Sequence, residues 1–339
     1  MKIKSQVYIL NSIYLNKKFH IDKEEYEIDG LNNFEKSLFL RANEKKLLEK
    51  QKLSDEINIL NKKILMRNLL IKNDVMLLAE VLNKNKIKYV FFKGIATLSS
   101  QNVASSRYLS DIDILIDKKS QEKFFMILIN ELKINSKFVP NYPYHKSKIN
   151  HSIESVKLNS GIYLDIHIRI TSPLDYSVCP LSDLALKNFY QDKNLNNAQV
   201  CSSEINYIVN IYNGFLKKEI HDRSHFLIDL INHHSESLDI DKIYMYAGKL
   251  NLSTQTNNSF EIIRSIKNNI INEELKKVIK SNESNKKIIF NKILWLIKNY
   301  IFSSRELTIE KYGKYYFENK ICYRFKFFYD KLKKLLKQS

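Results

Sequence analysis

The spacing of hydrophobic residues predicts helices in the first quarter of the chain. Between residues 43 and 84, apolar side chains recur every three or four positions, which places them on one face of an α-helix. One such stripe comprises Leu53, Ile57, Leu60 and Ile64. Residues 1–40 have no clear period, so no element is assigned to them. We expect residues 1–84 to form an N-terminal helical region that packs on the sheet predicted next.

Two runs after residue 84 have the period of β-strands. Residues 87–92 (IKYVFF) are β-branched and aromatic and end at Lys93-Gly94, which predicts a strand that enters a tight turn. Residues 108–117 (YLSDIDILID) carry isoleucine at every second position from 112 to 116, which predicts a strand with one apolar face. The acidic face of this strand carries Asp111, Asp113 and Asp117. The segment between the two strands suits a short helix or a loop.

A helix and a hairpin are predicted next. Residues 120–134 have a helical stripe, with Ser120 as the N-cap. Residues 151–158 and 161–170 both alternate and flank the turn sequence Asn-Ser-Gly at 159–161, which predicts a β-hairpin. The polar face of its second strand carries Tyr163, Asp165, His167 and Arg169.

The complete pattern predicts an α/β (α+β) fold. A small mixed sheet in residues 85–180 follows the N-terminal helical region, and residues 181–339 are expected to form a helical C-terminal domain because the strand pattern fades after Pro180. No secretory signal is visible and no apolar run approaches the roughly 18 residues that a membrane-spanning helix needs. The three cysteines have no metal-site spacing, so a cytoplasmic location is expected by elimination.

The net charge of +18 invites a nucleic-acid partner without establishing one. The chain is rich in Lys, Asn and Ile together, a bias that an AT-rich genome supplies whatever the function, and the lysines are spread along the whole chain. The basic, aromatic segment 320–339 favours an amphipathic helix docked on its own domain, with an acidic partner, RNA or membrane lipid as the alternative.

Three aspartates are candidates for a metal site. Asp111 and Asp113 are two residues apart on one strand, so their carboxylates lie on the same face and can both bind one divalent ion. Asp165 on a neighbouring strand would complete a site for two Mg²⁺ (or Mn²⁺) ions that clamp the oxygens of a phosphoryl displacement. A bare Asp-x-Asp is more often a half-exposed strand that shows its acids to solvent. The upstream Lys-Gly turn and the downstream acidic strand are what favour a metal site here.

Three segments carry a resemblance to a known family. KYVFFKGIATL (88–98), SSRYLSDIDILID (105–117) and YLDIHIRI (163–170) resemble the nucleotidyltransferase superfamily with the DNA polymerase β fold. More narrowly, they are similar to an uncharacterised bacterial nucleotidyltransferase family. The resemblance extends from about residue 70 to 250 and includes HDRSHFLIDLINHH (221–234). It implies a polymerase β-like sheet.

The resemblance also implies roles for individual residues. Asp111 and Asp113 would hold both metals, and Asp165 would hold the catalytic metal and orient or deprotonate the acceptor hydroxyl. The residues expected near the nucleotide are Lys93, Gly94, Arg107 and Ser110. His167 would orient Asp165, shuttle a proton or contact the acceptor; the alternative is a structural histidine. The superfamily usually has Ser or Gly after its glycine, whereas this chain has Ile95, which leaves open how a triphosphate is held.

The reaction expected from this resemblance is transfer of a nucleotidyl group from an NTP to a hydroxyl or phosphate acceptor. The acceptor stays open among a small molecule, a peptide and tRNA. One alternative is a toxin-like tRNA or protein nucleotidyltransferase of an abortive-infection system. Others are a natural-product or sugar tailoring transferase that uses a nucleotide-sugar donor, and a non-catalytic binding module. The oligomeric state is also open.

Overall fold

The computed structural model describes most of the chain up to residue 270. The described residues are 3–19, 31, 33–47, 54–101, 107–134, 155–171, 180–216 and 238–270. The family-like segment 221–234 and the basic segment 320–339 lie outside them, so the predictions made for these two segments are not addressed by the structure. Among the described helices, none is long and apolar enough to cross a membrane.

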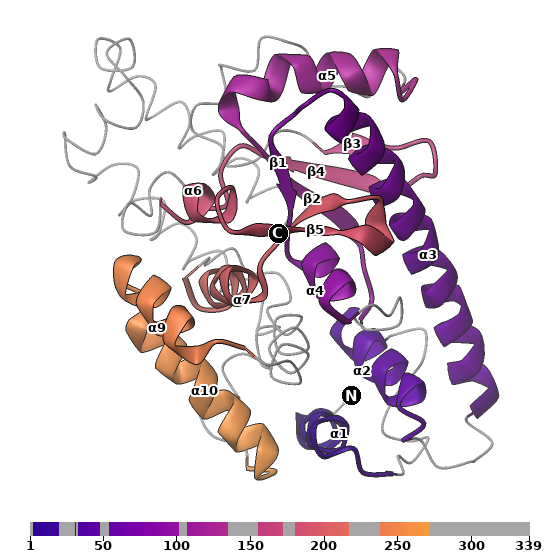
Figure 1. Cartoon of the computed structure of the whole chain (residues 1–339). Helices are drawn as coiled ribbons and strands as arrows, with labels where there is room; N and C mark the ends of the chain where they lie inside the picture. Colours follow the sequence, from indigo (N-terminus) through magenta and orange to yellow (C-terminus); the bar gives the residue numbers. More distant parts are fainter. Residues whose placement is uncertain are drawn as a thin grey trace, which may run out of the picture.

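A mixed six-stranded sheet lies at the centre of the described fold (Figure 1). Its strand order is β3 (Val156–Lys157), β4 (Tyr163–His167), β2 (Asp111–Ile116), β1 (Tyr89–Phe91), β6 (Ala198–Cys201) and β5 (Phe189–Asp192). Strand β2 pairs with β4, and β1 with β6, in parallel; the remaining neighbours are antiparallel. The predicted α+β class, with helices around a mixed sheet, is confirmed.

The strands predicted from alternation are present. Strands β1 and β2 fall inside the predicted runs, and β3 and β4 form the predicted hairpin. Gly161 in its turn has a φ of 86°, a left-handed conformation that glycine adopts without the clash a Cβ would cause. Both faces of β2 are covered, because every residue from Ile112 to Ile116 is buried. The face of β2 that carries Asp113 is therefore not exposed to solvent.

Two strands were not predicted. Strands β5 and β6 lie in the stretch expected to be helical, and that part of the prediction is wrong. Strand β5 (FYQD) is an edge strand whose first three residues are exposed, and β6 (AQVC) has only four residues, so neither contains an apolar alternation long enough to detect. The division of the chain at residues 84 and 180 stays a prediction.

Helices surround the sheet. The long helix α3 (Ser54–Lys84) packs on β2 and β6, and α4 (Gly94–Gln101) packs on the same two strands. The described helices on the N-terminal side also include α1 (Ile3–Leu15) and α2 (Asn33–Glu44). The described α-helices that follow β2 are α5 (Gln121–Asn130), α6 (Leu181–Ala185), α7 (Ser203–Ile211), α9 (Ile240–Lys249) and α10 (Ser253–Lys267). Helices α9 and α10 lie on the opposite side of the molecule from α3 (Figure 1).

The first and last described helices are in contact. Helix α1 packs against α10, and Asn11 on α1 donates from Nδ2 to the carbonyl oxygens of Ile266 and Lys267, at 2.8 and 2.9 Å. These carbonyls belong to the last turn of α10, where the i+4 donors of the helix run out; the Ile266 carbonyl also accepts from the Asn269 N–H at 3.1 Å. An N-terminal side chain therefore caps the C-terminal end of the described fold.

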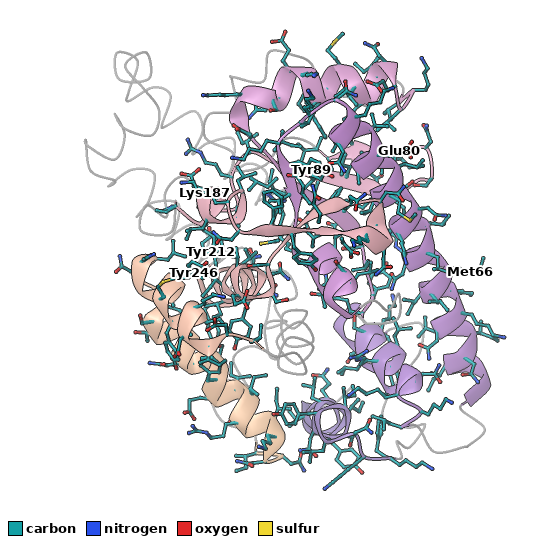
Figure 2. All side chains as sticks on the ribbon, viewed as in Figure 1. Met66, Glu80, Tyr89, Lys187, Tyr212 and Tyr246 are labelled. Atoms are coloured by element: carbon teal, nitrogen blue, oxygen red, sulfur yellow. The ribbon has the colours of Figure 1, made fainter. Side chains whose placement is uncertain are left out.

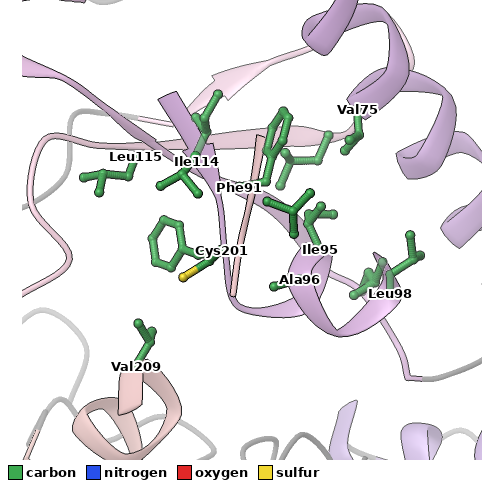
Figure 3. Packing of buried hydrophobic residues seen from close by; sticks show 14 of the residues in the cluster. Val75, Phe91, Ile95, Ala96, Leu98, Ile114, Leu115, Cys201 and Val209 are labelled. Atoms are coloured by element: carbon green, nitrogen blue, oxygen red, sulfur yellow. The ribbon is translucent and has the colours of Figure 1, made fainter. Parts of the chain in front are cut away.

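One hydrophobic core joins the sheet to its helices (Figure 3). Val75 of α3 and Ile95 of α4 lie near Phe91, and Val209 of α7 approaches from another direction. Ile95 is only 1% exposed, so its side chain faces the core and not a phosphate. The one described cysteine, Cys201, is buried and in no disulfide.

Candidate metal and nucleotide site

The parallel pairing of β2 and β4 brings two of the predicted aspartates side by side. In the register of this pair, Asp113 is opposite Asp165 and Leu115 is opposite His167. Neighbouring strands are about 4.8 Å apart, and residues opposite one another project to the same face of a sheet. Asp113 and Asp165 therefore form a carboxylate pair that is fixed by backbone hydrogen bonds.

His167 bridges the two carboxylates. Its Nε2 lies 3.1 Å from Asp113 Oδ1 and 3.0 Å from Asp165 Oδ2. Because a carboxylate oxygen only accepts, the Nε2–H of His167 donates to both. The ring also packs edge-on against Phe92, with centroids 5.0 Å apart, which fixes its orientation.

Lys93 completes the charged cluster. Its Nζ forms an ion pair and a hydrogen bond with Asp113 Oδ1. Asp113 and His167 are almost completely buried, whereas the side chains of Lys93 and Asp165 are 22% and 24% exposed. Lys93 and Asp165 are thus the members of the cluster that a ligand can reach from outside.

The charges of this cluster stabilise one another. Burial alone would raise the pKa of Asp113, but the Lys93 ammonium and the hydrogen bond from His167 hold it well below its usual value. Burial would likewise raise the pKa of Asp165, and His167 lowers it. Burial and Lys93 lower the pKa of His167, yet its bonds to the two carboxylates raise it overall. At neutral pH both carboxylates are ionised.

Asp111 lies at the edge of this cluster. It begins β2 on the same face as Asp113, and its Oδ1 accepts a hydrogen bond of 2.8 Å from Ser110 Oγ. Burial and the negative charge of Asp113 raise the pKa of Asp111. Among the described residues, the possible ligand atoms that lie within 4.8 Å of one another belong to Asp113, Asp165 and His167. A metal-ligand role for Asp111 stays a prediction.

The Lys93-Gly94 turn is held by a residue that the sequence did not reveal. Lys93 has a φ of 52°, which is unfavourable for a residue with a side chain. Asn206 of α7 accepts from the Lys93 N–H at 2.7 Å and donates to the Lys93 carbonyl at 3.2 Å. The same carbonyl accepts from the backbone N–H and the hydroxyl of Thr97. These bonds fix the peptide so that the ammonium reaches Asp113.

Gly94 and Arg107 are in close contact. A Cβ at position 94 would lie 2.5 Å from Arg107 Nη2 and 2.6 Å from Leu109 Cδ2. Arg107 is 9% exposed and Leu109 is buried, so a Cβ at position 94 would force the ends of two packed side chains to shift. The absence of a Cβ at Gly94 thus lets the Arg107 guanidinium lie directly against its backbone. This contact brings together two of the four residues predicted near the nucleotide, Gly94 and Arg107.

Helix α3 holds the segment that leads into β2. Asn68 donates to the carbonyl of Arg107 at 2.7 Å and accepts from the N–H of Leu109 at 3.2 Å. Arg67 donates to the carbonyls of Leu109 and Ser110, at 3.0 and 2.6 Å. The sequence does not indicate these contacts. The hydrophobic periodicity of this region predicts which face of the helix is buried, but not which polar residues make hydrogen bonds. These contacts position Arg107 and the start of the acidic strand.

The donor set fits a divalent cation. Two ionised carboxylates side by side suit Mg²⁺, which prefers hard oxygen ligands, and a carboxylate pair with an imidazole also suits Mn²⁺. His167 becomes a ligand only when its Nε2 has lost its proton; otherwise it remains a donor that orients the carboxylates. Lys93 compensates part of the acidic charge and is oriented from the turn that leads out of β1.

A comparison with known protein families identifies the family of this chain. A family model described as an uncharacterised nucleotidyltransferase matches residues 39–266, which is more than half of the chain and includes every residue of the site from Arg67 to Asn206. No curated protein and no solved structure matches the chain. The chain therefore belongs to this uncharacterised nucleotidyltransferase family.

Proposed function

We propose that this protein transfers a nucleotidyl group from an NTP to a hydroxyl or phosphate acceptor, with β2 and β4 as the catalytic strands. The observation that carries the proposal is the register of Asp113 with Asp165, which places two ionised carboxylates next to each other in a nucleotidyltransferase family member. In the proposed reaction, an acceptor oxygen attacks the α-phosphorus and the bond to the β-phosphate oxygen breaks. Pyrophosphate leaves with that electron pair.

Each residue of the cluster has a proposed role. Asp113 and Asp165, together with Asp111, which lies on β2 like Asp113, would hold one or two divalent ions. Such ions, Mg²⁺ or Mn²⁺, would neutralise phosphate charge and stabilise the attacking and leaving oxygens. Asp165 is the more exposed of the paired carboxylates, so it accepts the proton of the acceptor hydroxyl. His167 orients both carboxylates through its Nε2–H.

The proposed phosphate contacts come from the turn after β1. Lys93, whose side chain is partly exposed and whose Nζ pairs with Asp113, binds a triphosphate oxygen. Arg107 contributes a second cation against the Gly94 backbone, and Ser110 directly precedes β2. Because Ile95 is buried in the core, the triphosphate is held by these cations and by backbone N–H groups of the turn.

A labelling screen tests the donor and the acceptor together. Purified protein is incubated with each of the four α-labelled NTPs, or with nucleotide-sugars, in cell extract that is then separated into RNA, protein and small molecules. We expect label from one NTP in one fraction, with pyrophosphate released. Label in tRNA or protein would favour a toxin-like enzyme. Transfer from a nucleotide-sugar alone, or no transfer at all, would overturn the proposal.

Binding of Mn²⁺ provides a test that does not depend on the substrate. We expect the wild type to bind Mn²⁺, detected by loss of the free-ion electron paramagnetic resonance signal, and the double variant Asp113→Asn, Asp165→Asn to leave the ion free. The reason is that both ionised oxygens of the pair are removed. Asp183→Asn, an exposed acid on α6, is the matched control and should bind like the wild type. Equal binding by all three proteins would contradict the ligand assignment.

Asn206 should affect activity through Lys93. Asn206→Leu removes both hydrogen bonds that hold the Lys93 peptide, so we expect kcat/KM for NTP to fall by about 10- to 100-fold, as the loss of one or two buried hydrogen bonds implies. Asn210→Leu is the control: it is buried one turn further along α7, and its Nδ2 has no hydrogen-bond partner in the described part of the chain. A steady-state NTP titration of both variants measures the difference. Equal losses would mean that Asn206 only packs.

A further inference from the structure

Helix α3 has an exposed apolar stripe on the side that faces away from the sheet. The helix is 31 residues long and its other side packs on β2, β6, α2 and α5. Figure 2 shows Met66 pointing outward at the edge of the molecule. The exposed apolar residues nearest the middle of this side are Ile59 (53%), Met66 (69%), Leu70 (47%) and Leu77 (54%). Four large apolar side chains along one line of a helix are unusual on a surface that has no partner.

The exposed line has the spacing of a coiled-coil seam. Positions 59, 63, 66, 70, 73 and 77 are separated alternately by four and three residues, which is the a/d pattern of a heptad repeat. We call these six residues the outer seam; they are Ile59, Lys63, Met66, Leu70, Asn73 and Leu77, and all are exposed. The core-facing residues of α3, such as Ile64, Ile71 and Val75, lie on the other side of the helix. The helix therefore has one seam for its own sheet and another that is available to a partner.

We propose that the outer seam binds the outer seam of a second copy of this chain in an antiparallel helix pair. The seam is symmetric about position 68, since 59 and 77, 63 and 73, and 66 and 70 are equally far from it. An interface with twofold symmetry requires this self-complementarity. Ile59 meets the partner subunit's Leu77, and Met66 meets the partner subunit's Leu70. Each a position then faces a d position, which is the layering of antiparallel coiled coils.

The two polar seam residues determine the direction of pairing. In the antiparallel register, the Lys63 ammonium lies opposite the partner subunit's Asn73, whose amide oxygen accepts from it. In a parallel pair, Lys63 would meet the partner subunit's Lys63, and two like charges would be brought together in the seam. A polar residue at a seam position is a known means of selecting register and orientation. Charge thus favours a second copy in the antiparallel arrangement.

The oligomeric state in solution tests the proposal. Sedimentation velocity of the full chain at tens of micromolar should give twice the chain mass of 40.2 kDa. Leu70→Glu should give a folded monomer with an unchanged circular dichroism spectrum, because this side chain is exposed in the single chain. Met126→Glu on α5, which is 52% exposed and outside the seam, should remain a dimer. A monomeric wild type, or a Leu70→Glu variant that stays dimeric, would overturn the proposal.

Disulfide formation tests the direction of pairing. A mixture of the Met66→Cys and Leu70→Cys proteins should form an intermolecular disulfide on oxidation well above the wild-type background, because these positions face one another and a disulfide needs Cα atoms within about 7 Å. Either variant alone should crosslink much less. If Met66→Cys crosslinks best with itself, the pair is parallel and the proposed register is wrong. None of these readouts depends on nucleotidyl transfer.

Discussion

Asp113→Asn should abolish nucleotidyl transfer while the protein remains folded. Asn keeps the volume of the side chain, and its amide oxygen still accepts from His167 or Lys93, so the packing between β2 and β4 is preserved. The ionised oxygen beside Asp165 is lost, however, and with it the pair that would hold a divalent ion. We expect the rate to fall by about 10³-fold or more, since the electrostatic stabilisation of a phosphoryl transition state is typically worth several kcal/mol.

The matched control is another acid from the same predicted strand. Asp117 follows β2, and its side chain accepts from the N–H of Lys119, where it caps a short 3₁₀ helix (Lys118–Ser120). Asp117→Asn retains an accepting oxygen for this cap, and we expect normal transfer rates. The assay measures incorporation of α-labelled nucleotide, with circular dichroism as the check on folding. Full activity of Asp113→Asn would show that β2 is not the catalytic strand.

Gly94→Ala should reduce both stability and activity. The new methyl group would lie 2.6 Å from Cδ2 of the buried Leu109 and 2.5 Å from Nη2 of Arg107, so both side chains have to move. Overpacking of a well-packed interior costs about 1–3 kcal/mol, which thermal unfolding detects as a lower melting temperature. We also expect kcat/KM for NTP to fall at least about tenfold, in line with the 1.4 kcal/mol that one factor of ten requires, because Arg107 leaves its place beside the turn.

Gly248→Ala is the control for that substitution. Gly248 lies within α9, and a Cβ built there meets nothing within 4 Å. Alanine in a helix interior is more favourable than glycine by up to about 1 kcal/mol, so this variant should unfold at a slightly higher temperature. Replacing glycine by alanine is thus expected to lower the melting temperature at position 94 and to raise it at position 248. If Gly94→Ala also raised the melting temperature, the close contact with Arg107 would be wrong.

The sequence predicted the central strands of the site because their alternation is regular. Asp113 and Asp165 each follow an isoleucine pattern, so their faces could be assigned before their pairing was known. That Asp113 lies directly opposite Asp165 could not be predicted, because the parallel register of β2 and β4 depends on backbone pairing between segments about 50 residues apart. His167 was predicted on the right face, but its bond to Asp113 follows only from that register.

The residues that were not predicted from the sequence lie in elements where the spacing of hydrophobic residues indicates only which side is buried. Asn206 is an interior residue of α7, and nothing in its neighbourhood distinguishes it from Asn210 on the next turn. Arg67 and Asn68 occur in a stretch that was predicted to be helical from its apolar residues. That pattern does not indicate which polar side chains of the helix bind a distant loop. Strand β5 was missed because it is an exposed edge strand with no alternating apolar face.

The hydrogen bonds from Asn11 to the end of α10 have a consequence for synthesis of the chain. The partners are 255 and 256 positions apart, so α1 leaves the ribosome long before the carbonyls that it caps exist. Contacts of such sequence separation form late and slow folding, since a long loop must close before they stabilise anything. Until then the apolar face of α1, with Leu10 and Ile13 buried in the finished fold, lacks its α10 neighbour. The nascent chain therefore carries an incomplete N-terminal packing surface until α10 has been made.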